Sequence, residues 1–145
     1  MPRNILIMGA AGKDFHTFNT QYRDNEEFRV VAFTATQIPG IDDRKYPSEL
    51  AGKLYPEGIE ILPESELTNI IKEREVDEVV FAYSDVTYDY VGERRRIVEE
   101  AGAKFSTPNP RDVMIPSNKP VIAVCAVRTG CGKSQTTRRV IQILR

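Results

Sequence analysis

The 145-residue sequence contains no apolar run that approaches the roughly 20 residues of a membrane-spanning helix. It also has no marked excess of either charge: the formal net charge is −1, which argues against a broad electrostatic surface for nucleic acid or membrane. The short apolar run near the start leads straight into a glycine turn, which is unlike a signal peptide. We therefore expect a cytoplasmic protein whose partners are small molecules, with no nucleic acid and no membrane among them.

Cysteine is also scarce, and the two that occur, Cys125 and Cys131, lie in the same segment. We expect one core residue and one loop residue there rather than a disulfide or a metal pair. Apolar residues make up 41% of the chain and charged residues 28%, which is typical of a folded globular protein. The length suffices for one domain, or for one domain and part of another.

Short apolar runs alternate with helical patterns through the first 106 residues. Residues 5–8 are continuously apolar, as expected for a strand covered on both faces, and the turn "GAAGKD" follows. Further strands are predicted at residues 30–33, 59–62, 79–82 and 104–106, with helices at residues 15–22, around 48–54, from about 63 and at 86–102. This β-α-β alternation predicts an α/β fold with a doubly wound, Rossmann-like parallel sheet and right-handed crossovers.

A proline-rich stretch, "TPNPRDVMIPSNKP", follows the last of these strands. Its four prolines in 14 residues cannot continue a helix or a central strand. We therefore predict a Rossmann-like domain at residues 1–106, a linker at residues 107–119, and the beginning of a second domain at residues 120–145.

The second domain opens with "VIAVCAVRTGCGKSQTTRRVIQIL", in which the apolar run at residues 121–127 predicts a strand that enters a glycine turn and then a helix. Gly130, Gly132, Lys133 and Ser134 match a phosphate-binding loop, whereas Val127 takes the place of its first glycine. In such loops, backbone N–H groups hold the phosphates, the lysine neutralises β and γ charge, and the hydroxyl ligates magnesium. The alternative is a glycine-rich turn that binds nothing.

The predicted ligand of this loop is a nucleoside triphosphate, ATP or GTP, with Mg²⁺ as cofactor. Lys133 is the predicted catalytic residue and Ser134 the predicted magnesium ligand. The predicted phosphate-binding residues are Arg128, Thr129, Gly130, Cys131, Gly132, Lys133, Ser134 and Gln135.

The loop "RTGCGKSQT" resembles those of the deviant-Walker and dethiobiotin-synthetase-like ATPases, in which the first glycine is also dispensable. In the deviant-Walker group a lysine near the start of the loop reaches across a dimer. Arg128 occupies that position, so the resemblance implies a possible homodimer and a phosphate contact by Arg128. A solvated or structural arginine is the alternative.

Four stretches, "RNILIMGAAGKDFHTFN", "VVAFTATQIPGI", "VDEVVFAYSDV" and "KPVIAVCAVRTGCGKSQT", resemble the start of a family found mainly in archaea and thermophilic bacteria. Its members are described as predicted GTPases or as cyclic 2,3-diphosphoglycerate synthetase-like proteins. The resemblance implies a longer protein, in which a Rossmann-like domain precedes a full P-loop domain that drives phosphorylation or cyclisation of a phosphoglycerate.

A complete P-loop domain also needs an acidic residue at the end of a second strand to hold magnesium, and residues that recognise the base. Neither fits in the 12 residues that follow Lys133, so we expect this domain to be incomplete. On the same ground we expect the 145-residue chain alone to be inactive as an NTPase.

Gly9 and Gly12 form half of a dinucleotide-binding fingerprint, since they follow a strand and precede a helix. A nicotinamide site also expects an acid at the end of the second strand, where residues 34–37 are Thr-Ala-Thr-Gln. We therefore predict no nicotinamide cofactor here. A simple turn and a substrate or anion site remain open, the latter formed by the N–H groups of the helix N-terminus beside Lys13.

Asp85 follows the strand at residues 79–82, at the carboxyl edge where open α/β sheets place ligands. It is a candidate for substrate or magnesium binding, although it precedes the phosphate loop, unlike the familiar order. Alternatively, Ser84, Asp85 or Thr87 caps the next helix. His16, the only histidine, is expected to be a surface or packing residue.

These features favour an NTP-hydrolysing protein, or an ATP-dependent phosphotransferase or synthetase, that acts on a small phosphorylated or acidic metabolite. Two alternatives stay open. One is a Rossmann module that binds a dinucleotide or CoA, and the other is a nucleotide-sensing module without chemistry of its own.

Overall fold

The structure is a computed structural model that describes residues 1–10, 12–36, 44–126 and 131–145. It divides into two compact units, Met1–Met114 and Ile115–Arg145, each of which is described by itself. The division falls inside the predicted linker, and the predicted domain bounds stay a prediction. None of the helices in the described residues combines the length and the apolarity that a bilayer crossing requires.

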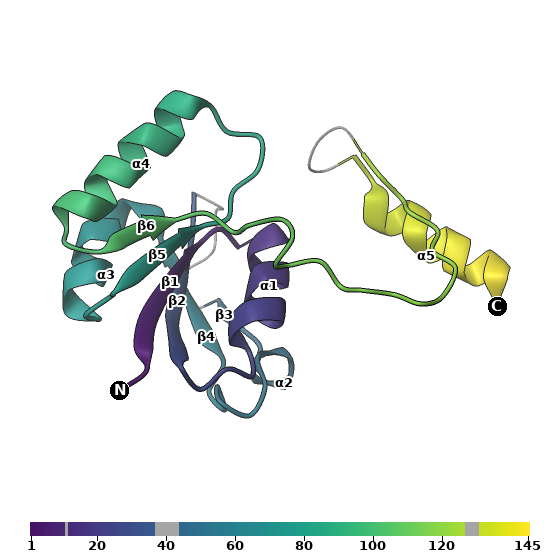
Figure 1. Ribbon diagram of the computed structural model, residues 1–145, viewed down its shortest axis with the longest axis horizontal. Helices are drawn as coiled ribbons and strands as arrows, with labels where there is room; N and C mark the ends of the chain where they lie inside the picture. Colours follow the sequence, from purple (N-terminus) through teal and green to yellow (C-terminus); the bar gives the residue numbers. More distant parts are fainter. Residues whose placement is uncertain (11, 37–43, 127–130) are drawn as a thin grey trace. The chain divides into compact units, whose positions relative to one another are not determined.

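The first unit is built on one sheet, in which six strands are described, in the order β3-β4-β2-β1-β5-β6 (Figure 1). Every neighbouring pair is parallel except β3 and β4, which are antiparallel. The strands are β1 (Arg3–Met8), β2 (Phe28–Ala35), β3 (Lys45–Tyr46), β4 (Ile59–Pro63), β5 (Glu78–Phe81) and β6 (Lys104–Ser106). The mostly parallel, Rossmann-like α/β fold is thereby confirmed, and only the short edge strand β3 was not predicted.

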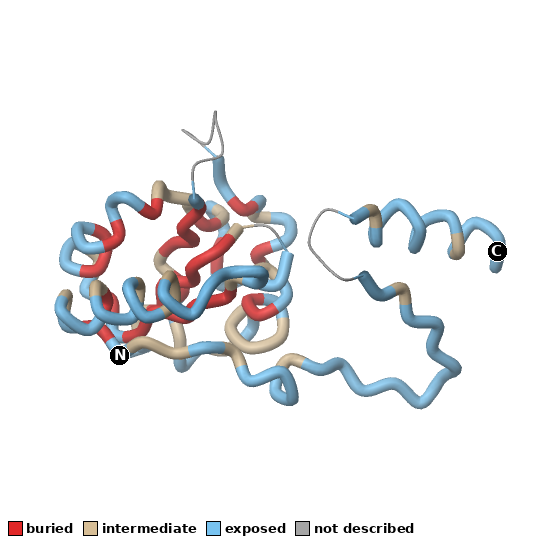
Figure 2. The backbone as a smooth tube through the Cα atoms, turned by 90° about the horizontal axis from the view of Figure 1, so that it is seen from above, coloured by how far each residue is buried: buried red, intermediate tan, exposed pale blue. Residues whose placement is uncertain are grey.

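Helices cover both faces of this sheet. One face carries α1 (Lys13–Thr17), which continues as the π-helix η1 (Phe18–Tyr22), and also α2 (Ser48–Ala51). The other face carries α3 (Leu67–Glu73), preceded by the 3₁₀ turn η2 (Glu64–Glu66), and α4 (Tyr88–Glu100). Buried backbone runs through the middle of the unit in Figure 2.

Strand β1 shows why its sequence is continuously apolar. Ile5 and Ile7 pack into the core beneath η1 and α2, whereas Leu6 and Met8 pack into the core beneath α3 and α4. All four side chains are fully buried. Successive residues of a strand point to opposite faces of the sheet, and here helices cover both faces.

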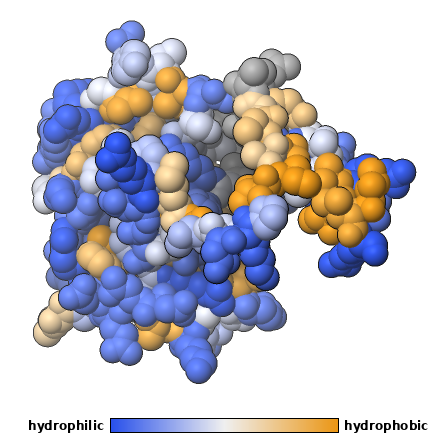
Figure 3. All heavy atoms as spheres, turned by 45° about the vertical axis from the view of Figure 1, so that its right-hand side comes forward, coloured by the Kyte–Doolittle hydropathy of each residue, from blue (hydrophilic) through white to orange (hydrophobic). Residues whose placement is uncertain are grey.

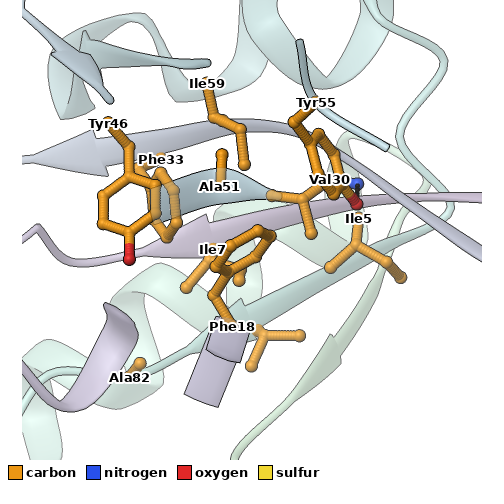
Figure 4. Close-up of a cluster of buried hydrophobic side chains, with 11 residues drawn as sticks. Ile5, Ile7, Phe18, Val30, Phe33, Tyr46, Ala51, Tyr55, Ile59 and Ala82 are labelled. Carbon is orange, nitrogen blue, oxygen red and sulfur yellow. Dashed lines mark hydrogen bonds between the residues drawn. The ribbon is translucent and has the colours of Figure 1, made fainter. Parts of the chain in front are cut away.

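Aromatic rings fill much of the first of these cores. The centroid of the Phe18 ring lies 5.7 Å from that of the Phe33 ring and 5.3 Å from that of the Tyr55 ring, in edge-to-face contacts (Figure 4). The buried Tyr55 hydroxyl accepts a hydrogen bond from the backbone N–H of Val30 at 3.1 Å. These contacts hold η1 against the sheet and thereby fix the helix that begins at the candidate glycine turn.

The stretch after β6 is held against the α1–η1 helix by two side chains. His16 Nε2 lies 2.6 Å from the carbonyl oxygen of Val113, and Gln21 Nε2 lies 2.5 Å from that of Asp112. His16 is exposed, so the prediction of a surface or packing residue holds. It anchors the segment that leads out of the first unit.

In the second unit the regular structure described is one helix, α5 (Lys133–Leu144). The strand expected at residues 121–127 does not form in the described part, residues 121–126, and Val127 lies outside the described residues. The physical reason is that a strand needs a hydrogen-bonded partner, and none of the described strands pairs with this stretch.

Apolar side chains of this unit lie on its outside, as the orange atoms in Figure 3 show. They include Ile115, Val121, Ile122, Ile141, Ile143 and Leu144. Both cysteines are exposed, so the expectation that one of them is a core residue is wrong. That expectation depended on the predicted strand at residues 121–127, which does not form in its described part.

Candidate functional site

The direction of winding reverses at β1. Strands β2 and β4 extend the sheet on one side of β1, and β5 and β6 extend it on the other. The helices that follow β1 and β5 cover opposite faces, so the loops after these two strands diverge at the carboxyl edge. Open α/β sheets bind their ligands at such a topological switch point.

We call this region the switch-point edge: the β1–α1 turn, of which residues 9, 10, 12 and 13 are described, and the β5–α4 loop, residues 82–87. Strands β1 and β5 are adjacent, and the N–H of Ala82 donates to the carbonyl oxygen of Met8 at 3.0 Å. The fold therefore brings the predicted residues Gly9, Gly12 and Lys13 to the same edge as Asp85.

The β1–α1 turn is organised around Asp14, a residue that the sequence reasoning did not single out. Its side chain is 3% exposed, and its Oδ1 atom accepts hydrogen bonds from the N–H groups of Gly12 and Phe15, both at 2.7 Å. Gly9 has φ +123°, and its N–H donates to the carbonyl oxygen of Thr34 at 2.8 Å. The sequence signal that could have pointed to Asp14 was the presence of an acid in the first turn of a helix.

The β5–α4 loop carries Asp85 in a left-handed conformation, with φ +60°. Its side chain is exposed. Among the three predicted caps of the next helix, the structure selects Thr87, whose hydroxyl accepts from the N–H of Tyr90 at 3.3 Å. The helix predicted from residue 86 begins at Tyr88, and Val86 precedes it and is 39% exposed.

A buried polar cluster, also missed from the sequence, lies behind this loop. Glu64 is 7% exposed and accepts hydrogen bonds from the hydroxyls of Tyr83, at 2.6 Å, and Tyr90, at 2.5 Å. Arg94 forms an ion pair with it, with Nε 3.2 Å from Oε1, and its guanidinium carbon lies 4.8 Å from the centre of the Tyr90 ring. We call these four residues the Glu64 cluster. It ties β4, β5 and α4 together.

The Glu64 cluster changes the acidity of both tyrosines. Burial and the hydrogen bond to the Glu64 carboxylate raise the pKa of Tyr83 far above its usual value, against the opposing effect of a hydrogen bond with Thr36. Burial, again with the hydrogen bond to Glu64, raises the pKa of Tyr90 to about 12. Both hydroxyls are therefore hydrogen-bond donors at neutral pH, and neither is a ready proton acceptor.

The end of β2 offers hydroxyls and no carboxylate in residues 34–36. The Thr34 side chain is fully buried, and its hydroxyl has no hydrogen-bond partner among the described residues. Gln37 lies outside the described residues. Glu64 lies near this region, since it follows Pro63, which pairs with Ala35. Its oxygens already bind the hydroxyls of Tyr83 and Tyr90, and Tyr83 also contacts Thr36.

The phosphate-loop prediction is only partly within the described residues, since Arg128, Thr129 and Gly130 lie outside them. Gly132 has φ +83° and precedes α5, and the N–H of Thr136 donates to its carbonyl oxygen at 3.1 Å. Lys133, Ser134 and Gln135 form the exposed first turn of that helix, next to the exposed Cys131.

The turn-to-helix transition therefore falls where the sequence placed it, and the roles of these residues stay predictions. In the described part of the chain, no three His, Cys, Asp or Glu side chains gather as they would around a metal ion.

No protein-family model matches this sequence. The chain is 57% identical over 142 residues to a protein of Thermococcus kodakarensis named arginine synthetase ArcE. The match covers 98% of this chain but only 32% of the length of that protein. It supports the predicted relation to a longer synthetase-like protein. It gives no support to a diphosphoglycerate as the substrate.

Two solved structures share the fold at low sequence identity. The first is UDP-D-quinovosamine 4-dehydrogenase from Vibrio fischeri, with a TM-score of 0.50, 23% identity, and coverage of 78% of this chain and 84% of that one. The second is RSP in complex with β-NADH, with a TM-score of 0.51, 15% identity, and coverage of 98% of this chain and 61% of that one. These likenesses show a Rossmann-like fold.

Proposed function

We propose that this chain is part of a nucleotide-dependent synthetase that takes part in forming arginine. A nucleoside triphosphate would bind at the loop of residues 128–135, and the small substrate would bind at the switch-point edge. The observation that carries the proposal is the 57% identity, over 98% of the chain, to a protein named arginine synthetase.

The described part of the loop is compatible with this role. The positive φ of Gly132 lets α5 start at Lys133, so the first N–H groups of the helix and the Lys133 ammonium lie at one end of the helix. In the proposed reaction Lys133 neutralises charge on the β and γ phosphates, and the Ser134 hydroxyl ligates Mg²⁺. Both side chains are exposed, as this access requires.

A second candidate function is a module that binds a dinucleotide at the switch-point edge. The observation in its favour is the shared fold with RSP, which was solved with β-NADH. The end of β2 speaks against it, because Thr34 and Thr36 stand where a carboxylate would bind the ribose hydroxyls.

The main proposal is tested in a chimera. The chain replaces the matched segment of the Thermococcus protein, and arginine formation is measured with ATP and with GTP. We expect the chimera to be active and Lys133→Ala to lower its activity by about 10- to 150-fold or more, since a charge-assisted phosphate contact contributes about 1.5–3 kcal/mol.

The control is Lys119→Ala, which removes an exposed ammonium from the same unit without touching the loop. We expect this variant to keep the activity of the unmodified chimera. A chimera that forms arginine equally well with Lys133→Ala would contradict the role of the loop. A chimera that is folded and inactive would contradict the proposed function itself.

A further inference from the structure

We propose that Asp14 determines ligand specificity at the switch-point edge by occupying the place of a ligand phosphate. A dinucleotide, whose pyrophosphate would need the N–H groups of the β1–α1 turn, would not bind there. The inference rests on the proposed function, in which this edge holds the small substrate and the nucleotide binds elsewhere.

The first argument is the use of the hydrogen-bond donors. In a dinucleotide site, the N–H groups at the start of the first helix point at the pyrophosphate. Here the N–H groups of Gly12 and Phe15 both donate to Asp14 Oδ1 at 2.7 Å. A phosphate oxygen would have to displace this carboxylate before it could receive either bond.

The second argument is space. A Cβ atom at Gly9 would lie 2.4 Å from Asp14 Oδ2, so the missing side chain of Gly9 makes room for the chain's own carboxylate. In a dinucleotide fingerprint, a glycine at this turn allows close approach to the pyrophosphate. Gly9, the first glycine of the pattern that suggested a phosphate site, is thus accounted for by Asp14.

The third argument is charge. A helix N-terminus is equivalent to about half a positive charge, whereas the Asp14 carboxylate carries a full negative charge and is 3% exposed. Lys13 is adjacent, but its side chain is exposed, and charge interactions of exposed side chains are weak in water. The buried charge at the turn therefore repels a phosphate.

The test uses the 145-residue protein in a Lys133→Ala background, which keeps the phosphate loop from contributing. Calorimetric titrations with inorganic pyrophosphate and with β-NADH are run on the protein that retains Asp14 and on the Asp14→Ala variant. We expect Asp14 protein to bind neither probe with a Kd below about 1 mM. We expect Asp14→Ala to gain at least about tenfold in pyrophosphate affinity, because it frees two N–H donors.

The matched control is Asp89→Ala, which removes an exposed acid from the first turn of α4. It should leave pyrophosphate affinity unchanged. If Asp14→Ala does not fold, as judged by circular dichroism, Asp14→Ser replaces it. The titrations of the protein that retains Asp14 test the inference even if neither variant folds.

Micromolar binding of β-NADH by the protein that keeps Asp14 would overturn the inference, and so would a folded Asp14 variant with no gain. Neither result bears on Lys133 in the chimera, so this inference and the proposed function can fail separately.

Discussion

At the scale of single residues, two helix N-termini of this chain differ in what they offer a ligand. The first turn of α1 contains the buried carboxylate of Asp14, which accepts the N–H groups of Gly12 and Phe15. The first turn of α5 contains no acid and presents Lys133 and Ser134 with exposed side chains. This difference supports the proposal that a phosphate binds at α5 and not at α1.

Ser134→Ala is the residue-scale prediction, measured in the active chimera. Because the hydroxyl would ligate magnesium, its loss should raise the Mg²⁺ concentration needed for half-maximal rate by about tenfold, while the affinity for metal-free nucleotide changes little. Ser117→Ala, an exposed serine of the same unit, is the control. Equal magnesium dependence in Ser134→Ala and the unmodified chimera would remove Ser134 from the metal site.

At the scale of elements, the Glu64 cluster fastens α4 to the carboxyl ends of β4 and β5. Glu64 directly follows β4, Tyr83 lies two residues beyond β5, and Tyr90 and Arg94 belong to α4. Buried hydrogen bonds and ion pairs between elements hold those elements in one arrangement. The cluster thus holds the β5–α4 loop at the switch-point edge.

Glu64→Gln should loosen this fastening, because an amide carries no charge for Arg94 and offers a single acceptor oxygen for two hydroxyls. We expect the free energy of unfolding to fall by about 1–3 kcal/mol, measured by urea denaturation. Glu66→Gln, an exposed neighbour in η2, should change it little. A stability loss equal to that of Glu66→Gln would contradict the role of the cluster.

The same variant has a spectroscopic signature in the alkaline range. With Glu64 present, Tyr90 stays protonated up to its pKa of about 12, so the folded state loses stability as pH rises from 10 through 12. In Glu64→Gln, absorbance at the tyrosinate band should show ionisation nearer the ordinary pKa of about 10. The pH-dependent loss of stability should shrink accordingly.

Elements with strong local signals could be predicted closely. The strand at residues 104–106 matches β6, and α4 ends before Gly102, whose φ of +96° suits the left-handed residue that terminates helices. The two-residue β3 has no periodicity of its own, since it exists only by pairing with Ile59 and Glu60. The strand at residues 121–127 had the right composition, but composition supplies no partner.

The site was less predictable than the fold, because many of its contacts join residues that are distant in the sequence. Gly9, Gly12, Lys13 and Asp85 could be assigned to one edge because parallel topology places them there. The pairing of Glu64 with Tyr83 and Tyr90 joins residues 19 and 26 positions apart, and no local pattern encodes such contacts.

At the scale of the whole molecule, the two units differ in how they are stabilised. Both hydrophobic cores are formed by residues of the first unit, whereas α5 has no buried residue. Residues 121–126 form no strand, and Val121 and Ile122 are 73% and 65% exposed. In a parallel α/β sheet such a run is paired on its edges and covered on its faces.

The last prediction concerns the 145-residue protein by itself: it should show no magnesium-dependent hydrolysis of ATP or GTP, and it should bind either nucleotide weakly. A loop that cradles phosphates is held in shape by the paired strand before it, and residues 121–126 form no strand. Binding would then have to supply the ordering free energy, about 1–2 kcal/mol for each residue fixed.

The measurement is phosphate release by the purified chain with ATP and with GTP, in the presence and absence of Mg²⁺. The matched sample is the active chimera, in which the same loop should turn over. Hydrolysis by the 145-residue protein that is lost in Lys133→Ala would show that the loop needs no further strand. In that case the exposed apolar side chains of Val121, Ile122 and α5 would need a partner other than the remainder of a P-loop domain.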